Sequence, residues 1–259
     1  RDVARVRPYT GTVWCLKVQD NKNFIVERGG TLAVCGNTDE VYGPILEGAH
    51  PEAAPLSPRS PYAASKAAGD LLVCAYQATY GLPAVIIRPT NTFGPSQFPE
   101  KLIPLCITNA LDNQPIPVYG DGLQQRCWLF VADLCQAIAR IVERGEVGRI
   151  YNVSSPWERP NLEVVRAILR SLGKPETLIQ FVQDRPGHDR RYAMESSRLA
   201  QLGWQASTSF EGGLRTTIAW YREHEAWWRP LAQQLREDPY HWLNRAPRTG
   251  ARSASGVEA

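Results

Sequence analysis

Residues 60–88 read SPYAASKAAGDLLVCAYQATYGLPAVIIR and decide the fold class of this chain. Residues 60–80 predict a helix that ends at Gly81, because glycine readily adopts the backbone conformation that closes a helix. Residues 84–88 are mostly apolar, which is typical of a strand buried in a parallel sheet. A similar short run at residues 32–35 precedes the helix. Strand, helix and strand in this order predict a βαβ crossover, and therefore an α/β fold with part of a doubly wound, Rossmann-like parallel sheet.

The rest of the chain alternates between predicted helices and strands. Helices are expected at residues 104–113, 132–144, 161–172, 197–202 and 210–227. Strands are expected at residues 12–17, 24–26, 116–119, 127–130, 149–153 and 179–182, with 116–119 and 127–130 as a pair. We expect a loop at residues 89–95 and a disordered tail at residues 244–259, which have little to bury. The pattern predicts a smaller C-terminal α/β domain after the first sheet.

Composition excludes several classes of protein. With 259 residues, 43% hydrophobic and 21% charged, the chain has the balance of an ordinary globular protein. The net charge of +3 comes from arginines near the two ends, so no basic face for nucleic acid is expected. The six cysteines form no C-x-x-C pair and do not cluster with the four histidines, so we expect neither a metal site nor a disulfide framework. No apolar run approaches a membrane span and no signal peptide opens the chain, which favours a cytoplasmic protein.

Three side chains follow the predicted strand at residues 32–35. Thr38, Asp39 and Glu40 are expected at the carboxyl edge of the sheet, where open α/β sheets bind their ligands. Adjacent carboxylates repel each other, which separates their pKa values and lets one donate a proton while the other accepts one. On its own, however, an Asp-Glu pair is better explained as a turn with solvated acids, and the downstream tyrosine is what favours a functional site.

A Tyr-x-x-x-Lys pair opens the predicted helix. Tyr62 and Lys66 lie four residues apart, so they share one helix face. We expect the Lys66 ammonium to lower the pKa of the Tyr62 phenol from its ordinary value of about 10 toward use as a base. The alternative is an exposed tyrosine and lysine on a helix surface.

Several longer stretches carry a family resemblance. They are TDEVYG at 38–43, SPYAASKA at 60–67, QFPEKLIPL at 97–105, PVYGDG at 117–122, DRPGHDRRYA at 184–193 and EAWWRPL at 225–231. With them, the chain resembles the dTDP-glucose 4,6-dehydratases, members of the extended short-chain dehydrogenase/reductase family that act on nucleotide sugars. The resemblance covers about three quarters of the chain.

The resemblance implies a reaction and a role for each catalytic residue. Tyr62, assisted by Lys66 and Thr38, is the base for oxidation at the sugar C4 by NAD. Glu40 then removes the C5 proton while Asp39 protonates the departing C6 hydroxyl, and hydride returns to C6. The product is a 4-keto-6-deoxy sugar nucleotide.

The resemblance also implies the binding residues. NAD is contacted by Tyr62, Lys66 and Thr92. The nucleotide sugar is held by Asn91, Lys101, Leu102, Pro117, Tyr119, Arg126, Asn152, Asp184, Arg185 and His188. Family members pair through a helix bundle that includes the tyrosine helix, so a homodimer is implied.

The cofactor half is where the chain departs from the family. No Gly-x-x-Gly-x-x-Gly turn is found among the twenty glycines, and Met194 is the only methionine, so we expect a piece of a longer protein with weak or no turnover. Asn37, Thr92 and Cys127 replace residues usual in the family. The expected organisation is an irregular segment at 1–30, a remnant of the NAD-binding domain at 31–115 with a crossing after about 95, and a mainly nucleotide-sugar-binding part at 116–243.

Two other functions remain open at this point. Epimerases and decarboxylases of the same superfamily also use Tyr-x-x-x-Lys, although the Asp-Glu pair favours the elimination of water. A sugar-nucleotide-binding homologue without catalysis is the third possibility, because the 184–192 segment would keep its affinity without NAD.

Overall fold

The computed structural model describes residues 24–28, 31–35 and 38–237. The strand expected at 12–17 and the tail expected from 244 lie outside these residues. The helices are α1 (Pro61–Tyr80), α2 (Leu102–Leu111), α3 (Val131–Arg144), α4 (Asn161–Leu172), α5 (Ser197–Gln201), α6 (Phe210–Glu223) and α7 (Glu225–Glu237). The strands are β1 (Phe24–Arg28), β2 (Thr31–Cys35), β3 (Ala84–Pro89), β4 (Asn91–Phe93), β5 (Ile116–Tyr119), β6 (Gln125–Phe130), β7 (Ile150–Val153), β8 (Glu158–Pro160) and β9 (Ile179–Val182). Two short 3-10 helices, η1 (Asp39–Tyr42) and η2 (Glu176–Leu178), complete the set.

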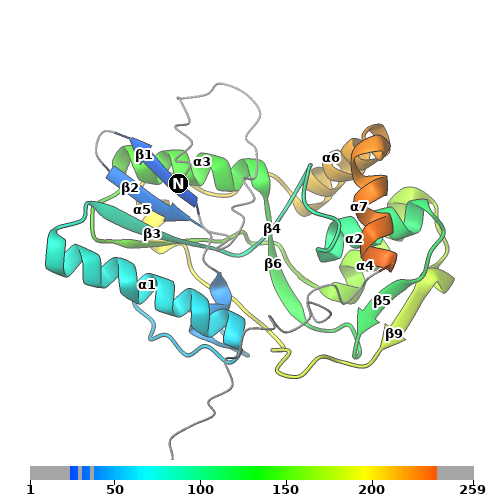
Figure 1. Ribbon diagram of the computed structural model, residues 1–259, viewed down its shortest axis with the longest axis horizontal. Helices are drawn as coiled ribbons and strands as arrows, with labels where there is room; N and C mark the ends of the chain where they lie inside the picture. The colour runs from blue at the N-terminus through cyan, green and yellow to red at the C-terminus, as the bar shows by residue number, and fades with distance from the viewer. Residues whose placement is uncertain (1–23, 29–30, 36–37, 238–259) are drawn as a thin grey trace, which may run out of the picture.

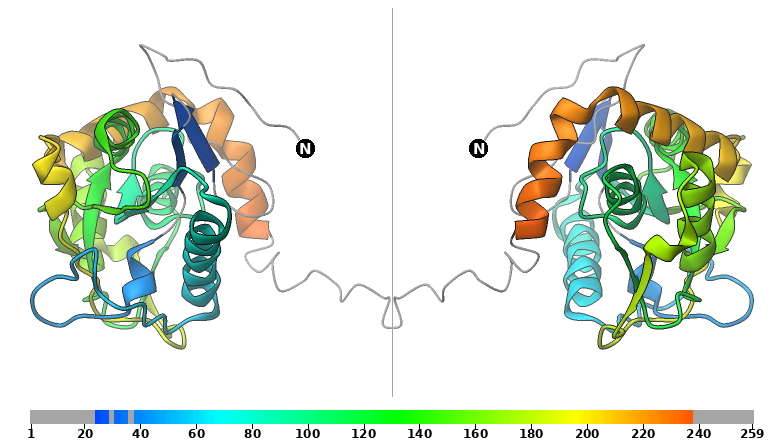
Figure 2. Two further views of the ribbon diagram at one scale, coloured as in Figure 1. Left: turned by 90° about the vertical axis from the view of Figure 1, so that its left-hand side faces the viewer. Right: turned by 90° about the vertical axis from the view of Figure 1, so that its right-hand side faces the viewer.

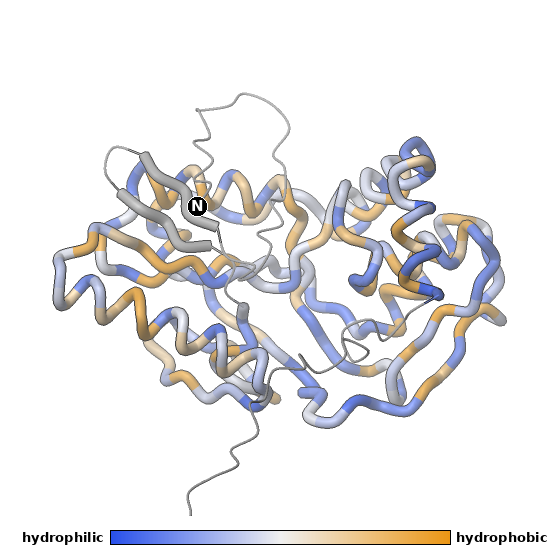
Figure 3. The backbone as a smooth tube through the Cα atoms, viewed as in Figure 1, coloured by the Kyte–Doolittle hydropathy of each residue, from blue (hydrophilic) through white to orange (hydrophobic). Residues whose placement is uncertain are grey.

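The first sheet has the strand order β1-β2-β3-β7. Strands β2, β3 and β7 are parallel, and the β2–α1–β3 crossover is present as predicted. The edge strand β1 runs antiparallel to β2, so the expected strand at 24–26 exists although residues 1–30 were expected to be irregular overall. Helices α1 and α3 cover opposite faces of this sheet (Figure 1). The apolar run of β3 is visible as a hydrophobic stretch in Figure 3.

The smaller C-terminal part contains two further sheets. Strands β4, β6 and β8 form one of them, and β5 pairs in parallel with β9 to form the other. The predicted pairing of residues 116–119 with 127–130 is therefore wrong. The loop expected at 89–95 is also wrong in part, because β4 lies within it and pairs with β6. Figure 2 shows this part from the side, with α6 and α7 following one another along its edge.

Strand β6 contributes to two hydrophobic cores, one in each part of the molecule. Its Trp128 packs in the core of α2, α4, α6 and α7, whereas the next residue, Leu129, packs in the core of β3, α3 and β7. Because successive strand residues point to opposite faces, a single strand can join the two cores. The first sheet and the smaller C-terminal part are thereby anchored to one another.

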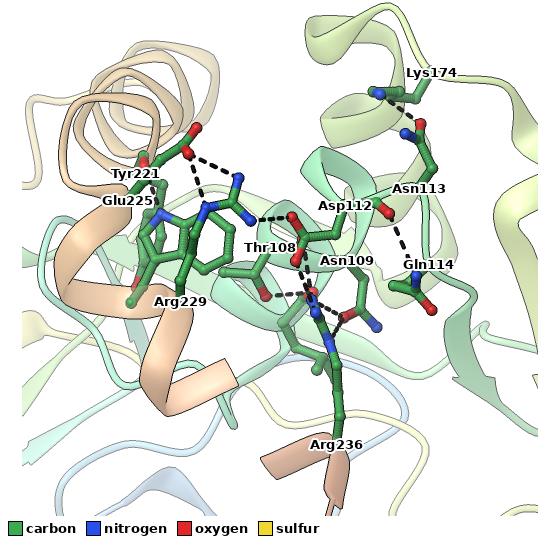
Figure 4. Close-up of polar contacts among 12 residues, drawn as sticks. Thr108, Asn109, Asp112, Asn113, Gln114, Lys174, Tyr221, Glu225, Arg229 and Arg236 are labelled. Carbon is green, nitrogen blue, oxygen red and sulfur yellow. Dashed lines mark hydrogen bonds and ion pairs between the residues drawn. The ribbon is translucent and has the colours of Figure 1, made fainter. Parts of the chain in front are cut away.

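The helix expected at 210–227 is two helices. Helix α6 ends at Glu223, the backbone of the next residue, His224, leaves the helical conformation, and α7 begins at Glu225. Helix α7 is tied back to α2 by Arg229 and Arg236, which lie 2.6 and 2.7 Å from the Asp112 carboxylate (Figure 4). Within the described ranges, no helix has the length and apolar character needed to cross a membrane.

Candidate active site

The turn after β2 presents the acidic pair. Thr38 caps η1: its Oγ1 accepts a hydrogen bond from the Glu40 amide at 3.3 Å and donates one to Asp39 Oδ1 at 3.0 Å. Gly43 ends the turn with φ +80°, and a Cβ there would approach the Ser57 carbonyl oxygen to 2.5 Å. A glycine is therefore required at the end of this turn.

Asp39 is the more deeply buried carboxyl group of the pair. Its side chain is 4% exposed, and Oδ2 has no hydrogen-bond partner among the described residues. Burial raises the pKa of Asp39 to about 6; the charge of Glu40 adds to the rise, and Arg126 and the Thr38 hydrogen bond oppose it. A carboxyl group with this pKa can carry a proton near neutral pH and donate it.

Glu40 faces a cluster of charges from distant parts of the chain. Burial raises its pKa; Arg126, Arg185 and Lys101 act in the opposite direction, and Asp189 adds to the rise. The expected site residues Arg126, Arg185 and Lys101 are thus brought to the same carboxylate from β6, the 183–196 segment and the start of α2.

The helix that carries the tyrosine begins as predicted. Ser60 Oγ accepts a hydrogen bond from the Ala63 amide at 3.0 Å, and Pro61 occupies the first helical position. The Nζ atom of Lys66 lies 5.7 Å from the centroid of the Tyr62 ring, on the shared helix face. Lys66 is buried, whereas 47% of the Tyr62 side chain is exposed.

The predicted lowering of the Tyr62 pKa is wrong for this structure. Desolvation, together with the charges of Glu40 and Asp39, raises the pKa of Tyr62 to about 12. The helix spacing did place Lys66 nearby, but burial of the phenol and two carboxylates from another element raise its pKa. Tyr62 therefore needs additional positive charge, or protonation of the acidic pair, before it can act as a base near neutral pH.

Arg126 is a buried cation directed at the acidic pair. Its Nη2 donates to the Asp189 carbonyl oxygen at 3.0 Å and its Nη1 to the Gln125 carbonyl oxygen at 2.7 Å, while the guanidinium lies 4.4 Å from the Tyr192 ring centroid. Burial lowers the pKa of Arg126, and Asp39 is the first of the charges that oppose this. The guanidinium is thus fixed in place before any ligand binds.

A second group of side chains lies beside this cluster. Asp184 accepts hydrogen bonds from Gln124 Nε2 at 3.0 Å and pairs with His188 Nδ1 at 2.7 Å. The Tyr119 ring, nearly half exposed, meets the His188 ring edge to face with centroids 6.4 Å apart. Gly120 has φ +58°, and a Cβ there would lie 2.9 Å from Asp184 Oδ2. These contacts hold an exposed aromatic ring in one orientation, which is suited to covering a base.

A pocket of about 460 Å³ opens beside these residues. Its lining comes from the turn after η1, the segment before α1, and the 183–196 segment: Pro44, Leu46, Arg59, Arg185, Gly187, His188, Asp189 and Arg190. Arg59 pairs with Asp189 at 3.5 Å, while Arg185 makes no ion pair within the part of the chain that the structure describes. An arginine that is free to bind suits a phosphate group.

Comparison with known proteins identifies the family. A family model described as GDP-mannose 4,6 dehydratase matches residues 27–217, well over half of the chain. The chain belongs to this dehydratase family.

Relatives within the dehydratase family agree with the resemblance seen in the motifs. The chain is 47% identical over 196 residues to the dTDP-glucose 4,6-dehydratase of Streptomyces niveus, covering 75% of this chain and 58% of the relative. It is 50% identical over 202 residues to that of Xanthomonas campestris pv. campestris, covering 74% of this chain and 58% of the relative.

Solved structures confirm the α/β fold class. The dTDP-glucose 4,6-dehydratase of Bacillus anthracis in complex with NAD matches with a TM-score of 0.72 and 46% identity, over 75% of this chain and 63% of that one. The Streptomyces venezuelae enzyme with NAD and TYD bound matches with a TM-score of 0.74 and 46% identity, over 75% of this chain and 61% of that one. The chain thus spans about 60% of the length of these dehydratases.

Some expected binding residues lie apart from the cluster. The Asn152 side chain is buried on β7, where it accepts a hydrogen bond from the Tyr42 hydroxyl at 2.8 Å and donates to the His50 carbonyl oxygen. It is committed to internal packing and does not face the pocket. On β4, Thr92 donates to the Thr90 carbonyl oxygen at 3.1 Å. Asn91, Leu102 and Pro117 are half-buried on β4, α2 and β5.

One polar residue near the nucleotide side was missed from the sequence. Asn161 begins α4, and its amide donates to the Gln124 carbonyl oxygen at 3.0 Å. Its side-chain oxygen is buried without a partner among the described residues. Such a group is costly unless a ligand or water satisfies it, so Asn161 is a candidate contact. In the sequence it is indistinguishable from an ordinary helix-opening asparagine.

The site fits one end of NAD. Tyr62 and the buried Lys66 lie beside the turn at the carboxyl ends of β2 and β3, where dinucleotide-binding sheets place their ligand. The glycine-rich turn that holds the pyrophosphate in the dehydratase family is not in this sequence. Across the residues that the structure places, no group of histidine, cysteine and acidic side chains is arranged to hold a metal ion.

Proposed function

We propose that this chain carries the nucleotide-sugar site and the acid–base groups of a dTDP-glucose 4,6-dehydratase, which converts dTDP-glucose to dTDP-4-keto-6-deoxyglucose. The observation that carries the proposal is the acidic turn: Asp39 and Glu40 differ in burial and environment, and both face Arg126 and Tyr62. Eliminating water from a sugar needs one group that donates a proton and one that removes it.

Oxidation at C4 comes first. When bound, NAD would supply the hydride acceptor for oxidation at C4 and the hydride for reduction at C6. Tyr62 accepts the proton of the C4 hydroxyl, with Lys66 beside its ring supplying positive charge. Thr38 and Thr92 line this side of the proposed site. The high pKa of Tyr62 in the chain alone implies that bound groups must supply the remaining positive charge.

Elimination follows, because a C4 ketone acidifies the C5 proton. Glu40 removes that proton, and Asp39, which is protonated up to about pH 6, gives its proton to the departing C6 hydroxyl. Water leaves and a C5–C6 double bond forms. Hydride then adds at C6 and a proton at C5, so the product is the starting sugar less one water, with no net oxidation or reduction.

The nucleotide end is held by the second group of residues. Arg126 and Arg185 pair with the diphosphate, and Lys101 adds charge from the start of α2. Tyr119 covers the base, while Asp184 and His188 fix its position. Asn91, Leu102 and Pro117 are kept as proposed contacts on the family resemblance alone, whereas Asn152 is not, because its side chain is bonded to Tyr42 and His50.

We also propose a cytoplasmic homodimer that binds neither membranes nor nucleic acid. Helix α1 exposes Leu71, Leu72, Tyr76 and Tyr80, all more than half exposed. This apolar face is larger than a solvated helix needs, and a second copy of α1 would cover it.

Calorimetric titration of the purified chain with dTDP tests the binding half of the proposal. Arg185→Ala should weaken binding about tenfold or more, since a charge-assisted contact with phosphate is lost. Arg170→Ala, an exposed arginine at the far end of α4, is the matched control and should leave affinity unchanged. Equal binding by all three proteins, or no binding of dTDP, would overturn the proposed site.

A further inference from the structure

A buried arginine joins the two elements that carry the chemistry. Arg88, on β3, is only 2% exposed. Its Nε and Nη2 atoms both lie 2.8 Å from Asp70 Oδ2 on α1. Asp70 is eight residues after Tyr62 and four after Lys66, so the three side chains share one face of the helix. Arg88 therefore fixes the face of α1 that bears the Tyr-Lys pair.

The same guanidinium holds the acidic turn. Its Nη1 donates to the Tyr42 hydroxyl at 2.6 Å, and its plane lies 4.7 Å from the Tyr42 ring centroid. Tyr42 is the last residue of η1, three residues after Asp39. The ring is also stacked on His50, with centroids 5.3 Å apart. The turn is thus clamped through its final side chain.

The sheet register explains why the clamp is rigid. Arg88 and Asn152 are direct partners in the parallel pairing of β3 with β7, so their side chains leave the same face of the sheet. The Tyr42 hydroxyl lies between them, accepting from Arg88 and donating to Asn152 Oδ1 at 2.8 Å. Its donor and one acceptor position are both used, which leaves the ring little freedom.

We propose that Arg88, acting through Asp70 and Tyr42, is a positioning residue that sets the separation between the Asp39–Glu40 pair and the Tyr62–Lys66 pair. The catalytic meaning of that separation rests on the proposed function. Arg88, Asp70 and Tyr42 are buried and contact one another, with Asn152 and His50 beside Tyr42, so they act through other groups. A buried charged network in this place ties a turn and a helix that are otherwise joined by a long proline-rich loop.

Tyr42→Phe tests the clamp with the loss of one oxygen. The phenyl ring keeps its stacking, so the variant is expected to fold. Tyr151→Phe is the matched control: Tyr151 is also buried on β7, and its hydroxyl accepts from the Glu146 amide at 2.8 Å, on the other side of the sheet. Hydrogen exchange at the Glu40 and Gly43 amides, which are bonded within the turn, should rise about tenfold in Tyr42→Phe and stay unchanged in Tyr151→Phe.

The Asp39 carboxyl group provides a readout that a purely structural role would not move. Carbon-detected NMR titration should place its pKa near 6 in the starting chain and in Tyr151→Phe. In Tyr42→Phe it should fall toward 3.8 as the turn loosens and the carboxyl group becomes hydrated. Equal exchange and equal Asp39 titration in both variants would overturn the inference.

The outcome is separable from that of the proposed function. Affinity for dTDP should be the same in both variants, because the clamp does not contact the nucleotide side. A chain that fails to bind dTDP refutes the proposed function, and the exchange and titration results still decide whether Arg88 positions the turn.

Discussion

Replacing Asp39 with asparagine should stabilise the protein and remove its dehydration chemistry. The substitution keeps the shape of the side chain and an oxygen that can accept from Thr38. It removes only the charge that the folded chain must bury. The expected gain is large because this carboxyl group is both deeply buried and next to Glu40.

The magnitude follows from the pKa of Asp39. A change from 3.8 to about 6 corresponds to about 3 kcal/mol. Because the folded-state pKa is raised, the protonated form is favoured in the fold and the stability it provides is fully present below about pH 4. That stability is lost as the pH rises through 6, where the buried group must ionise. Asparagine has no such loss, although its amide N–H groups need acceptors, so 3 kcal/mol is an upper limit.

Urea unfolding at several pH values measures the difference directly. The free energy of unfolding of Asp39→Asn minus that of the starting chain should be near zero at pH 4. It should grow toward ~3 kcal/mol at pH 8, equivalent to a rise in Tm of about 6–12 °C. Glu163→Gln, at an exposed carboxylate on α4, should show no such trend. A difference that is independent of pH, or a destabilised variant at pH 8, would refute the reasoning.

Three further outcomes follow from the structure. Gly120→Ala should weaken dTDP binding, because the added Cβ would push against Asp184. Gly148 also has a positive φ but open space around it, so Gly148→Ala should lower the free energy of unfolding by about 1 kcal/mol and leave dTDP affinity unchanged. Titration of both variants with dTDP compares them. Asp112→Ala should lower the free energy of unfolding by about 1–2 kcal/mol at pH 7, because it releases two arginines of α7. The loss should be smaller in acid: burial raises the Asp112 pKa, but the hydrogen bonds from these arginines lower it below its ordinary value, so the stability that the carboxylate provides falls as it becomes protonated. Urea unfolding at pH 7 and pH 3 measures this difference. Tyr62→Phe should reduce turnover of dTDP-glucose by about 10²-fold or more without changing dTDP affinity, and an active variant would exclude the phenol as the base.

The first sheet could be predicted because the residue pattern that defines it lies within one continuous stretch of sequence. A continuous apolar run, a helix with a clear stop and a second run define the β2–α1–β3 unit without reference to the rest of the chain. Strand pairing beyond it is not local: β5 joins β9, some sixty residues away, and not the nearby β6. The break at His224 has no glycine or proline beside it to announce it.

The site shows the same division. Short motifs identified the acidic turn and the Tyr-Lys helix, and the structure places both at one cluster with Arg126. The sign of the Tyr62 pKa shift could not be predicted, because the helix spacing shows Lys66 but neither the burial of the phenol nor the carboxylates that approach from η1. The two asparagines show the same limit. Asn152 was expected to bind substrate but bonds to Tyr42, whereas Asn161 was not expected to and has a buried side-chain oxygen without a partner among the described residues. Only the packing shows which side-chain amide is satisfied internally.

The most direct test of the proposed chemistry is to incubate the chain, at a concentration equal to that of the sugar nucleotide, with NAD and dTDP-glucose in deuterium oxide. We expect dTDP-4-keto-6-deoxyglucose with deuterium at C5, formed slowly but detectably by NMR, and no product from Glu40→Gln. A C4 epimer without deuterium at C5 would indicate an epimerase. Recovery of unchanged dTDP-glucose from a chain that binds both NAD and dTDP-glucose would contradict the assignment of catalysis to these residues.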